Sequence, residues 1–245
     1  MKIITRLAVP ATLLAATAIA AAGDSTLVTF DDGNEGWTIQ NAATILETGG
    51  NPGAHLDHYQ FETFGINIAN TTTPAFLGNY VERGPVELTI DVTVDEMNFF
   101  GSPVLRSLVV EFRNSSLAQG GLPYVSVWTE IGLLQSNMPW TTFTATIEDP
   151  SATDLPAGWG GYGAEDPKTF EPILPEGVSF ADVLSNVDEI VFTTFVPGFF
   201  YGPMEVGLGV DNVGIAGAST SCPADLDGSG TVDGGDLGQL LGAWG

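Results

Sequence analysis

The residues best suited to metal chemistry lie near the C-terminus, between Asp225 and Asp236. This stretch has the spacing of a calcium loop, with Gly230 at the position where such a loop turns sharply. Oxygen ligands fall at every position where the loop needs one: Asp225, Asp227, Ser229, Thr231 through its backbone carbonyl, Asp233 and Asp236. A hard cation of this kind takes roughly six to eight oxygens. The spacing therefore predicts a Ca²⁺ site, whereas an acidic Gly/Ser linker would explain only the composition.

The residues that follow the loop predict a short helix, because apolar side chains recur there with helical spacing, at Leu237, Leu240, Leu241 and Trp244. Residues 222–245 resemble the dockerin modules of secreted bacterial proteins, whose calcium loop also closes with an aspartate, as at Asp236. Dockerins usually carry two such segments, and this sequence contains one. The resemblance implies an EF-hand-like calcium-binding tail over residues 218–245, with a cohesin-like or other protein as its partner.

A second candidate site lies in a glycine-rich loop over residues 158–163. Trp159 and Tyr162 are the residues that we expect to stack on the apolar faces of sugar rings, while polar loop groups bind the hydroxyls. The alternative is that both side chains simply pack against the rest of the domain. Elsewhere, Trp37 is expected in the core and Trp128 on a solvated sheet face.

Catalytic residue patterns are missing from the sequence. There is no nucleophile elbow and no phosphate loop. Cys222 is the single cysteine and lies at the start of the tail, where it either packs as a small apolar residue or links two chains. His55 and His58 are three residues apart and would face opposite sides of a strand, so we interpret them as surface or turn histidines rather than a zinc site. We predict a protein that is not an enzyme, and a polysaccharide-active hydrolase with two carboxylates remains the weaker alternative.

The N-terminus has the pattern of a secretory signal peptide over residues 1–22. Lys2 and Arg6 precede an apolar run over residues 7–22, which ends in small residues suited to cleavage. The run is shorter than the roughly 20 residues of a membrane span, although a retained anchor is an open alternative. We expect a secreted protein, extracellular or at the cell surface, with no membrane span after cleavage.

The chain is strongly acidic, with 30 Asp and Glu against 6 Lys and Arg and a formal charge of −24. Loss of Lys2 and Arg6 with the signal peptide leaves four basic residues and a charge of −26. Such a surface argues against nucleic acid, whose phosphates require Lys and Arg. It suits Ca²⁺ and neutral polysaccharide, and it also suits a general adaptation to an extracellular or saline setting.

Between the two ends, residues 24–217 predict strand after strand. Residues 86–94 alternate apolar and polar side chains over nine positions, the pattern of a half-buried strand. Further strands are predicted over residues 107–112, 124–131, 140–147, 189–196 and 206–215, and one short helix over residues 180–186. This pattern predicts a mainly β fold, an antiparallel jelly-roll β-sandwich, followed by the short EF-hand-like loop–helix segment.

Three motifs carry a second resemblance: Phe-Asp-Asp-Gly-Asn-Glu-Gly-Trp at residues 30–37, Gly-Gly-Asn-Pro-Gly at 49–53 and Gly-Val-Asp-Asn-Val-Gly-Ile at 209–215. Their order is similar to that in the galactose-binding-like sandwiches, especially the laminin-IV-like branch. The resemblance implies that Asp31 or Asp32 lies near Asp211, where many relatives hold a structural calcium. Turn and cap hydrogen bonds are the alternative role for these aspartates.

Together these features predict a carbohydrate-binding or adhesive sandwich with a calcium-dependent docking tail. The alternative is a structural extracellular protein that assembles through its tail and has no small ligand.

Overall fold

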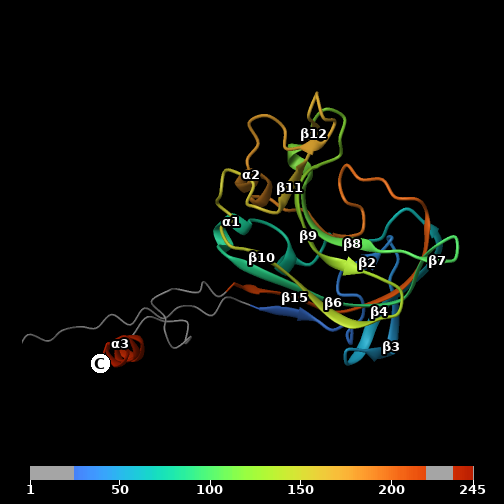
Figure 1. Cartoon of the computed structure of the whole chain (residues 1–245), viewed down its shortest axis with the longest axis horizontal. Coiled ribbons are helices and arrows are strands. Elements are labelled where there is room, and N and C mark those ends of the chain that lie inside the picture. The colour runs from blue at the N-terminus through green and yellow to red at the C-terminus, as the bar shows by residue number, and fades with distance from the viewer. Residues whose placement is uncertain (1–24, 219–233, 245) are drawn as a thin grey trace, which may run out of the picture. The chain divides into compact units, whose positions relative to one another are not determined.

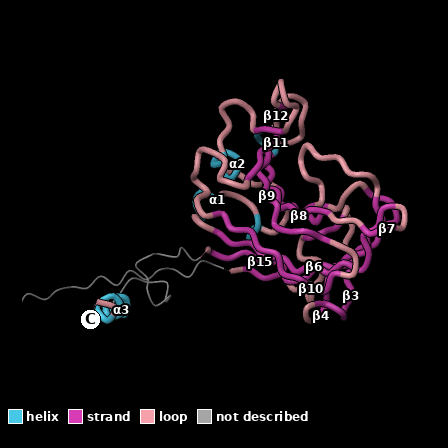
Figure 2. Tube along the Cα trace, viewed as in Figure 1, coloured by secondary structure: helices cyan, strands magenta, loops and turns pink. Residues whose placement is uncertain are grey.

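The computed structural model describes residues 25–218 and 234–244. Residues 25–218 form an antiparallel jelly-roll β-sandwich, which confirms the predicted fold class (Figures 1 and 2). The helix α3 (Gly234–Gly242) belongs to a separate unit.

Within the described residues the first sheet has the order β10 (Met138–Ile147), β6 (Val86–Phe99), β15 (Met204–Gly217), β4 (Gly53–Thr63) and β3 (Thr44–Gly50), with β1 (Thr26–Val28) on β15 and β7 (Ser102–Pro103) on β6. The second sheet, over the same residues, has the order β11 (Trp159–Tyr162), β9 (Val125–Leu134), β8 (Arg106–Asn114), β14 (Glu189–Thr193), β5 (Asn67–Asn70) and β2 (Trp37–Ile39). A small hairpin joins β12 (Ala164–Glu165) to β13 (Pro172–Ile173). The short helical elements of the sandwich are α1 (Tyr80–Arg83), α2 (Phe180–Leu184) and the 3₁₀ turns η1 (Pro74–Phe76) and η2 (Ser115–Leu117).

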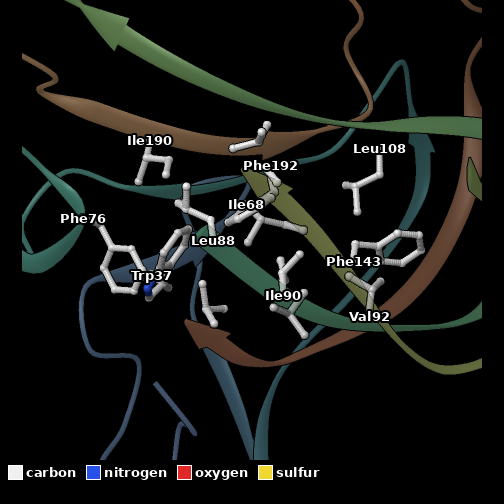
Figure 3. Packing of buried hydrophobic residues seen from close by; sticks show 14 of the residues in the cluster. Trp37, Ile68, Phe76, Leu88, Ile90, Val92, Leu108, Phe143, Ile190 and Phe192 are labelled. Atoms are coloured by element: carbon white, nitrogen blue, oxygen red, sulfur yellow. The ribbon is translucent and has the colours of Figure 1, made fainter. Parts of the chain in front are cut away.

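The core lies between the two sheets. In β6 the residues Val86, Leu88 and Ile90 are buried, whereas the intervening Glu87 and Thr89 face outward, as the alternating pattern predicts. Side chains from the second sheet meet them, with Ile68, Ile190 and Phe192 among the residues drawn in Figure 3. Trp37 is fully buried and packs edge-on against Phe76 with ring centroids 5.1 Å apart, which confirms its expected place in the core.

All six predicted strands form; five of them extend beyond the predicted range at one or both ends, and β14 ends earlier than predicted, at Thr193. The short helix is also confirmed as α2, which begins with a capping box between Ser179 and Asp182. The β3–β4 hairpin is an element that the sequence pattern did not predict. Most side chains of β3 are exposed, so the strand has no alternating apolar face that could reveal it.

Two long segments rise beside the second sheet. Residues 148–177, rich in Pro and Gly, supply β11 and the β12–β13 hairpin, and residues 194–203 connect β14 to β15. The two segments touch, because a Cβ atom on Gly198 would lie only 2.5 Å from Cδ of Pro172. Figure 1 shows the hairpin standing above the sheet, with the orange connection rising near it.

Candidate functional site

The outer face of the second sheet carries a cluster of charged side chains with little access to water. Arg113 on β8 lies between Glu111 on the same strand and Glu189 on the neighbouring β14. Its Nη2 and Nη1 atoms lie 2.5 Å and 3.0 Å from the respective Oε2 atoms. The side chain of Glu111 is 3 % exposed and that of Arg113 is 12 % exposed. Ser126 on β9 donates its hydroxyl to Oε1 of Glu111 at 2.5 Å, so the second carboxylate oxygen is also bound.

Two tyrosines lie at the edge of these charges. The guanidinium of Arg113 stacks over the ring of Tyr124, 4.4 Å from its centroid. Tyr124 in turn contacts Tyr162 of β11, with ring centroids 5.3 Å apart and planes inclined by 43°. Both tyrosines are half-buried, so part of each ring faces solvent. We call Glu111, Arg113, Tyr124, Ser126, Tyr162 and Glu189 the outer-face cluster.

Interactions within the cluster shift the pKa values of Arg113 and Tyr124. Burial lowers the pKa of Arg113, but the charge of Glu111 and the neighbouring Tyr124 and Glu189 more than offset this effect, so its pKa lies above the ordinary value. Burial and the charge of Glu111 raise the pKa of the Tyr124 phenol. The guanidinium therefore stays charged and the phenol stays neutral under ordinary conditions.

Other outward-facing residues of this sheet show that the face is partly covered. Val109 and Val191 are fully buried, although they alternate with the inward-facing Val110 and Phe192 and do not belong to the inter-sheet core. Trp128 lies over Gly160 of β11, where a Cβ atom would approach its ring to 2.4 Å. Trp128 is thus half-buried on the outer face, and its Nε1 is buried without a hydrogen-bond partner.

The structure separates the two aromatic residues expected to bind sugar. They are three residues apart on β11 and therefore point to opposite faces. Tyr162 joins the outer-face cluster. Trp159 instead packs against Phe112 and Phe180 from the inner side, at centroid distances of 5.9 Å and 5.1 Å, and lines a separate pocket of about 650 Å³ with an acidic rim.

The charged members of the cluster were not identified in the sequence. A usable signal exists in Glu111 and Arg113, which are two residues apart on a predicted strand and so share a face. Arg113 is also one of only six basic residues in the chain. The participation of Glu189 depends on the pairing of β14 with β8, which no local pattern reveals.

The aspartates expected to hold a second calcium gather around the β3–β4 turn. Asp31 accepts a hydrogen bond from the amide of Ala54 at 3.0 Å, and Asp211 accepts one from the amide of Asn51 at 2.5 Å. Burial raises the pKa of Asp211, and so does the nearby charge of Asp91. Among the described residues no set of three or more His, Cys, Asp or Glu side chains is arranged to hold a metal. As they stand, these carboxylates brace the turn through backbone amides, and a second calcium site here remains a prediction.

Most of the calcium loop, namely Asp225, Asp227, Ser229, Thr231 and Asp233, lies outside the described residues, as does Cys222. Asp236 is described and lies in the first turn of α3, where it is 3 % exposed. The helix predicted after the loop is present. Its apolar residues are exposed, among them Leu241 at 58 % and Trp244 just beyond the helix at 83 %.

The two histidines both lie on β4, and one prediction about them is wrong. His55 is only 7 % exposed and packs edge-on against Trp140, so it is neither a surface nor a turn residue. Glycine at position 209 makes room for this contact, because a Cβ atom there would lie within 3.1 Å of both rings.

No family model matches the sequence, and no curated protein matches it. Several solved structures resemble the fold. One contains the family 22 carbohydrate-binding and catalytic modules of endo-1,4-β-D-xylanase 10B from Clostridium thermocellum with xylohexaose, at 13 % identity and a TM-score of 0.46, and the match covers 84 % of this chain and 30 % of that one. Another is the family 11 carbohydrate-binding module from Clostridium thermocellum with a β-1,3-1,4-mixed-linked tetrasaccharide, at 13 % identity and a TM-score of 0.47, covering 81 % of this chain and 98 % of that one.

A third similar structure is the tandem of family 22 carbohydrate-binding modules from Paenibacillus barcinonensis Xyn10C, at 12 % identity and a TM-score of 0.45. Its match covers 83 % of this chain and 52 % of that one. In the part of the chain that the structure describes, no helix is long and apolar enough to cross a membrane.

Proposed function

We propose that this protein is a secreted, non-catalytic, calcium-binding protein whose sandwich binds a neutral polysaccharide at the outer-face cluster. The observation that carries this proposal is the burial of Arg113 between two carboxylates, directly beside two half-exposed tyrosines. A charge network on the outer side of a sheet does nothing for the inter-sheet core. Because apolar residues of similar size often stabilise a fold as well as a buried ion network does, the presence of this network favours a role in recognition.

The chemistry of the cluster suits a sugar chain. Tyr124 and Tyr162 offer ring faces for the apolar side of a pyranose. Glu189, whose side chain is 28 % exposed, can accept hydrogen bonds from hydroxyl groups. Arg113 holds the carboxylates of Glu111 and Glu189 in fixed positions, which lowers the entropy lost when a ligand binds.

The same arrangement favours a neutral polysaccharide over an acidic one. Both carboxylates already engage the guanidinium of Arg113, so no free cation in the cluster is left for a uronate. The formal charge of −24 also repels anionic chains as they approach.

Affinity electrophoresis tests this proposal. The full chain is run through gels that contain xylan, mixed-linked β-glucan or the acidic polymer polygalacturonate. We expect retardation in at least one neutral gel and none in polygalacturonate. The variants Tyr162→Ala and Tyr124→Ala should each lose most of that retardation, because aromatic contacts dominate such interfaces.

Two further variants locate the site. Phe170→Ala changes a residue that is 74 % exposed outside the cluster and should migrate like the parent protein. Trp159→Ala should also keep its retardation, after a check that it remains folded. Loss with Trp159→Ala but not with Tyr162→Ala would move the site to the pocket of about 650 Å³. Full retardation of both tyrosine variants would refute the site proposed here.

For the tail, our proposal is that the loop from Asp225 to Asp236 binds Ca²⁺ and orders a docking surface for a cohesin-like or other protein. Support comes from the ligand spacing in the sequence and from the helix α3, whose apolar side chains are exposed. A second Ca²⁺ between Asp31 and Asp211 belongs to the same proposal. Calcium stoichiometry measured by calorimetry tests it, since Asp211→Ala should remove one site, and an unchanged count would eliminate the second ion.

A further inference from the structure

Six exposed phenylalanines gather at one end of the sandwich. Two of them are almost fully open to solvent, Phe100 at 85 % and Phe200 at 80 %. The group, called the phenylalanine end below, consists of Phe61, Phe64, Phe99, Phe100, Phe199 and Phe200. Single exposed apolar side chains are normal on protein surfaces, but a contiguous group of them marks an interaction site.

Strand register brings these residues together from three separate segments. The start of β15 lies between the ends of β4 and β6, because Met204 pairs with Thr63 and Glu205 pairs with Asn98. Phe64 and Phe200 make ring contact at 5.4 Å between centroids. Phe99 packs against the connection between β14 and β15, because a Cβ atom on Gly202 would lie 2.5 Å from its ring.

The backbone at Phe100 adopts a conformation that is unfavourable for phenylalanine. Phe100 and Gly101 form the tip of the β6–β7 hairpin, with φ of +47° and +76°. A two-residue turn with both φ values positive favours Asn-Gly, and a bulky side chain in the first position is unfavourable. Phenylalanine here costs stability and gains no burial, so its role lies outside the fold.

A small pocket of about 220 Å³ opens within this end. Phe61, Phe100, Pro203 and Met204 give it apolar walls, while Glu62 and Glu205 place carboxylates at its rim. Sites for small organic ligands usually measure about 300–1,000 Å³, so this pocket is too small for most of them. Its size suits a single large side chain, the kind of anchor that fills a pocket at a protein interface.

The acidic residues around the pocket indicate which kind of partner can bind there. Glu62 and Glu205 line the pocket, and Glu96 lies nearby on β6, where it accepts a hydrogen bond from the lining residue Asn98. The nearby guanidinium of Arg106 lies behind the Tyr201 ring, and Arg106 is only 7 % exposed. A second copy of this chain would bring an equally acidic rim into contact, and the formal charge of −24 opposes such self-association.

We propose that the phenylalanine end is a docking site for a basic protein segment that inserts one large apolar side chain between flanking lysines or arginines. The apolar pocket supplies affinity, and the acidic rim supplies orientation and selectivity. This inference is independent of sugar binding, because the outer-face cluster shares no residue with the pocket.

Three fluorescein-labelled peptides test the inference by fluorescence anisotropy with the full chain. The first has a central tryptophan flanked by lysines, the second replaces the lysines with glutamates, and the third keeps the lysines but has alanine in place of tryptophan. We expect the first peptide to bind about tenfold or more tightly than either of the others. Its affinity should fall with added salt, because acidic rim groups contribute to it.

Protein variants then separate docking from folding. Phe100→Asn should raise the melting temperature, since asparagine suits the turn, and should weaken the first peptide about fivefold or more. Glu205→Gln should weaken it less and flatten the salt dependence. Phe170→Ser, which alters another exposed phenylalanine elsewhere, and Tyr162→Ala should both leave peptide binding unchanged.

Four outcomes would overturn the inference. Equal binding of the tryptophan and alanine peptides would show general charge attraction without a pocket. Unchanged affinity of Phe100→Asn would place the binding elsewhere. Dimers seen by sedimentation in the parent protein and lost in Phe100→Asn would identify a second copy as the occupant, and gel retardation by polysaccharide lost in Phe100→Asn would identify a sugar chain.

Discussion

Arg113 is the residue on which the outer-face cluster depends. Replacing it with methionine would leave Glu111, with a side chain 3 % exposed, buried without a cation. We expect Arg113→Met to destabilise the fold by about 3–5 kcal/mol, the usual cost of breaking a buried ion pair from one side. Urea unfolding followed by fluorescence measures the effect. Lys168→Met serves as the control, because Lys168 is exposed and its loss should change stability by less than about 0.5 kcal/mol.

A second prediction at this scale concerns pH. The phenol of Tyr59 donates a hydrogen bond to Glu205 at 2.7 Å, and this bond raises the pKa of Tyr59 to about 12. A raised phenol pKa means that the contribution to stability is present below pH 10 and is lost as pH rises toward 12. Absorbance titration of the tyrosines should show several late-titrating groups, because the pKa values of Tyr80 and Tyr124 are also raised, and one of these groups should shift to lower pH in Glu205→Gln. An identical titration curve in the variant would contradict the assignment.

These residues show how far a sequence can identify a site. Tyr162 was predicted from its glycine-rich loop, and the structure places it against Tyr124, which stacks on Arg113, while its contact with sugar stays a prediction. Trp159 came from the same loop and faces the other way, because the loop is a strand and three residues reverse the direction of a side chain. Arg113 and Glu189 form an ion pair across 76 positions of the chain, and only the sheet pairing brings them together.

Among the elements, β11 and β15 each contain a glycine that can be tested, and only the glycine in β11 is required by packing. A Cβ atom on Gly160 of β11 would lie 2.4 Å from the Trp128 ring, whereas one on Gly207 of β15 would meet only ordinary contacts at 3.6–3.8 Å. We expect Gly160→Ala to cost about 1–3 kcal/mol through overpacking and to displace Trp128. Gly207→Ala is the matched control and should be neutral or slightly stabilising, because alanine restricts the unfolded chain.

Thermal unfolding of both variants, with tryptophan emission as a second signal, checks this prediction. Similar melting temperatures for the two variants would show that the Trp128 ring can move away from residue 160 without loss of stability.

Strands could be predicted from the sequence where one face is buried and the other is exposed to solvent. β6 alternates over its predicted length, and its burial follows the same alternation except at Asp91, which is buried. β3 is mostly exposed on both faces, so its pairing with β4 provides the only evidence for it. The β12–β13 hairpin has two residues in each strand and no apolar pattern, so no local signal predicts it.

At the scale of the whole molecule, calcium binding is the property that the sequence predicts most directly. We expect the mature chain to bind at least one Ca²⁺ with modest affinity, in the range of extracellular modules. A version that ends at Ser219 should bind one fewer, because it lacks the loop from Asp225 to Asp236. Calorimetric titration of both forms, after removal of metal with chelator, gives the comparison. Equal stoichiometry would show that the loop is not a calcium site.

The course of β15 has a consequence for how the sandwich could be held at a surface. Its last residues pair with the beginnings of β1 and β6, so the chain enters and leaves the sandwich side by side, near Thr26 and Gly217. Its first residue, Met204, lies at the phenylalanine end. At about 3.3 Å per residue, these two ends of one strand are roughly 40 Å apart. The point where the chain leaves the sandwich and the phenylalanine end therefore lie at opposite ends of one strand, so a partner held at either end would leave the other end uncovered.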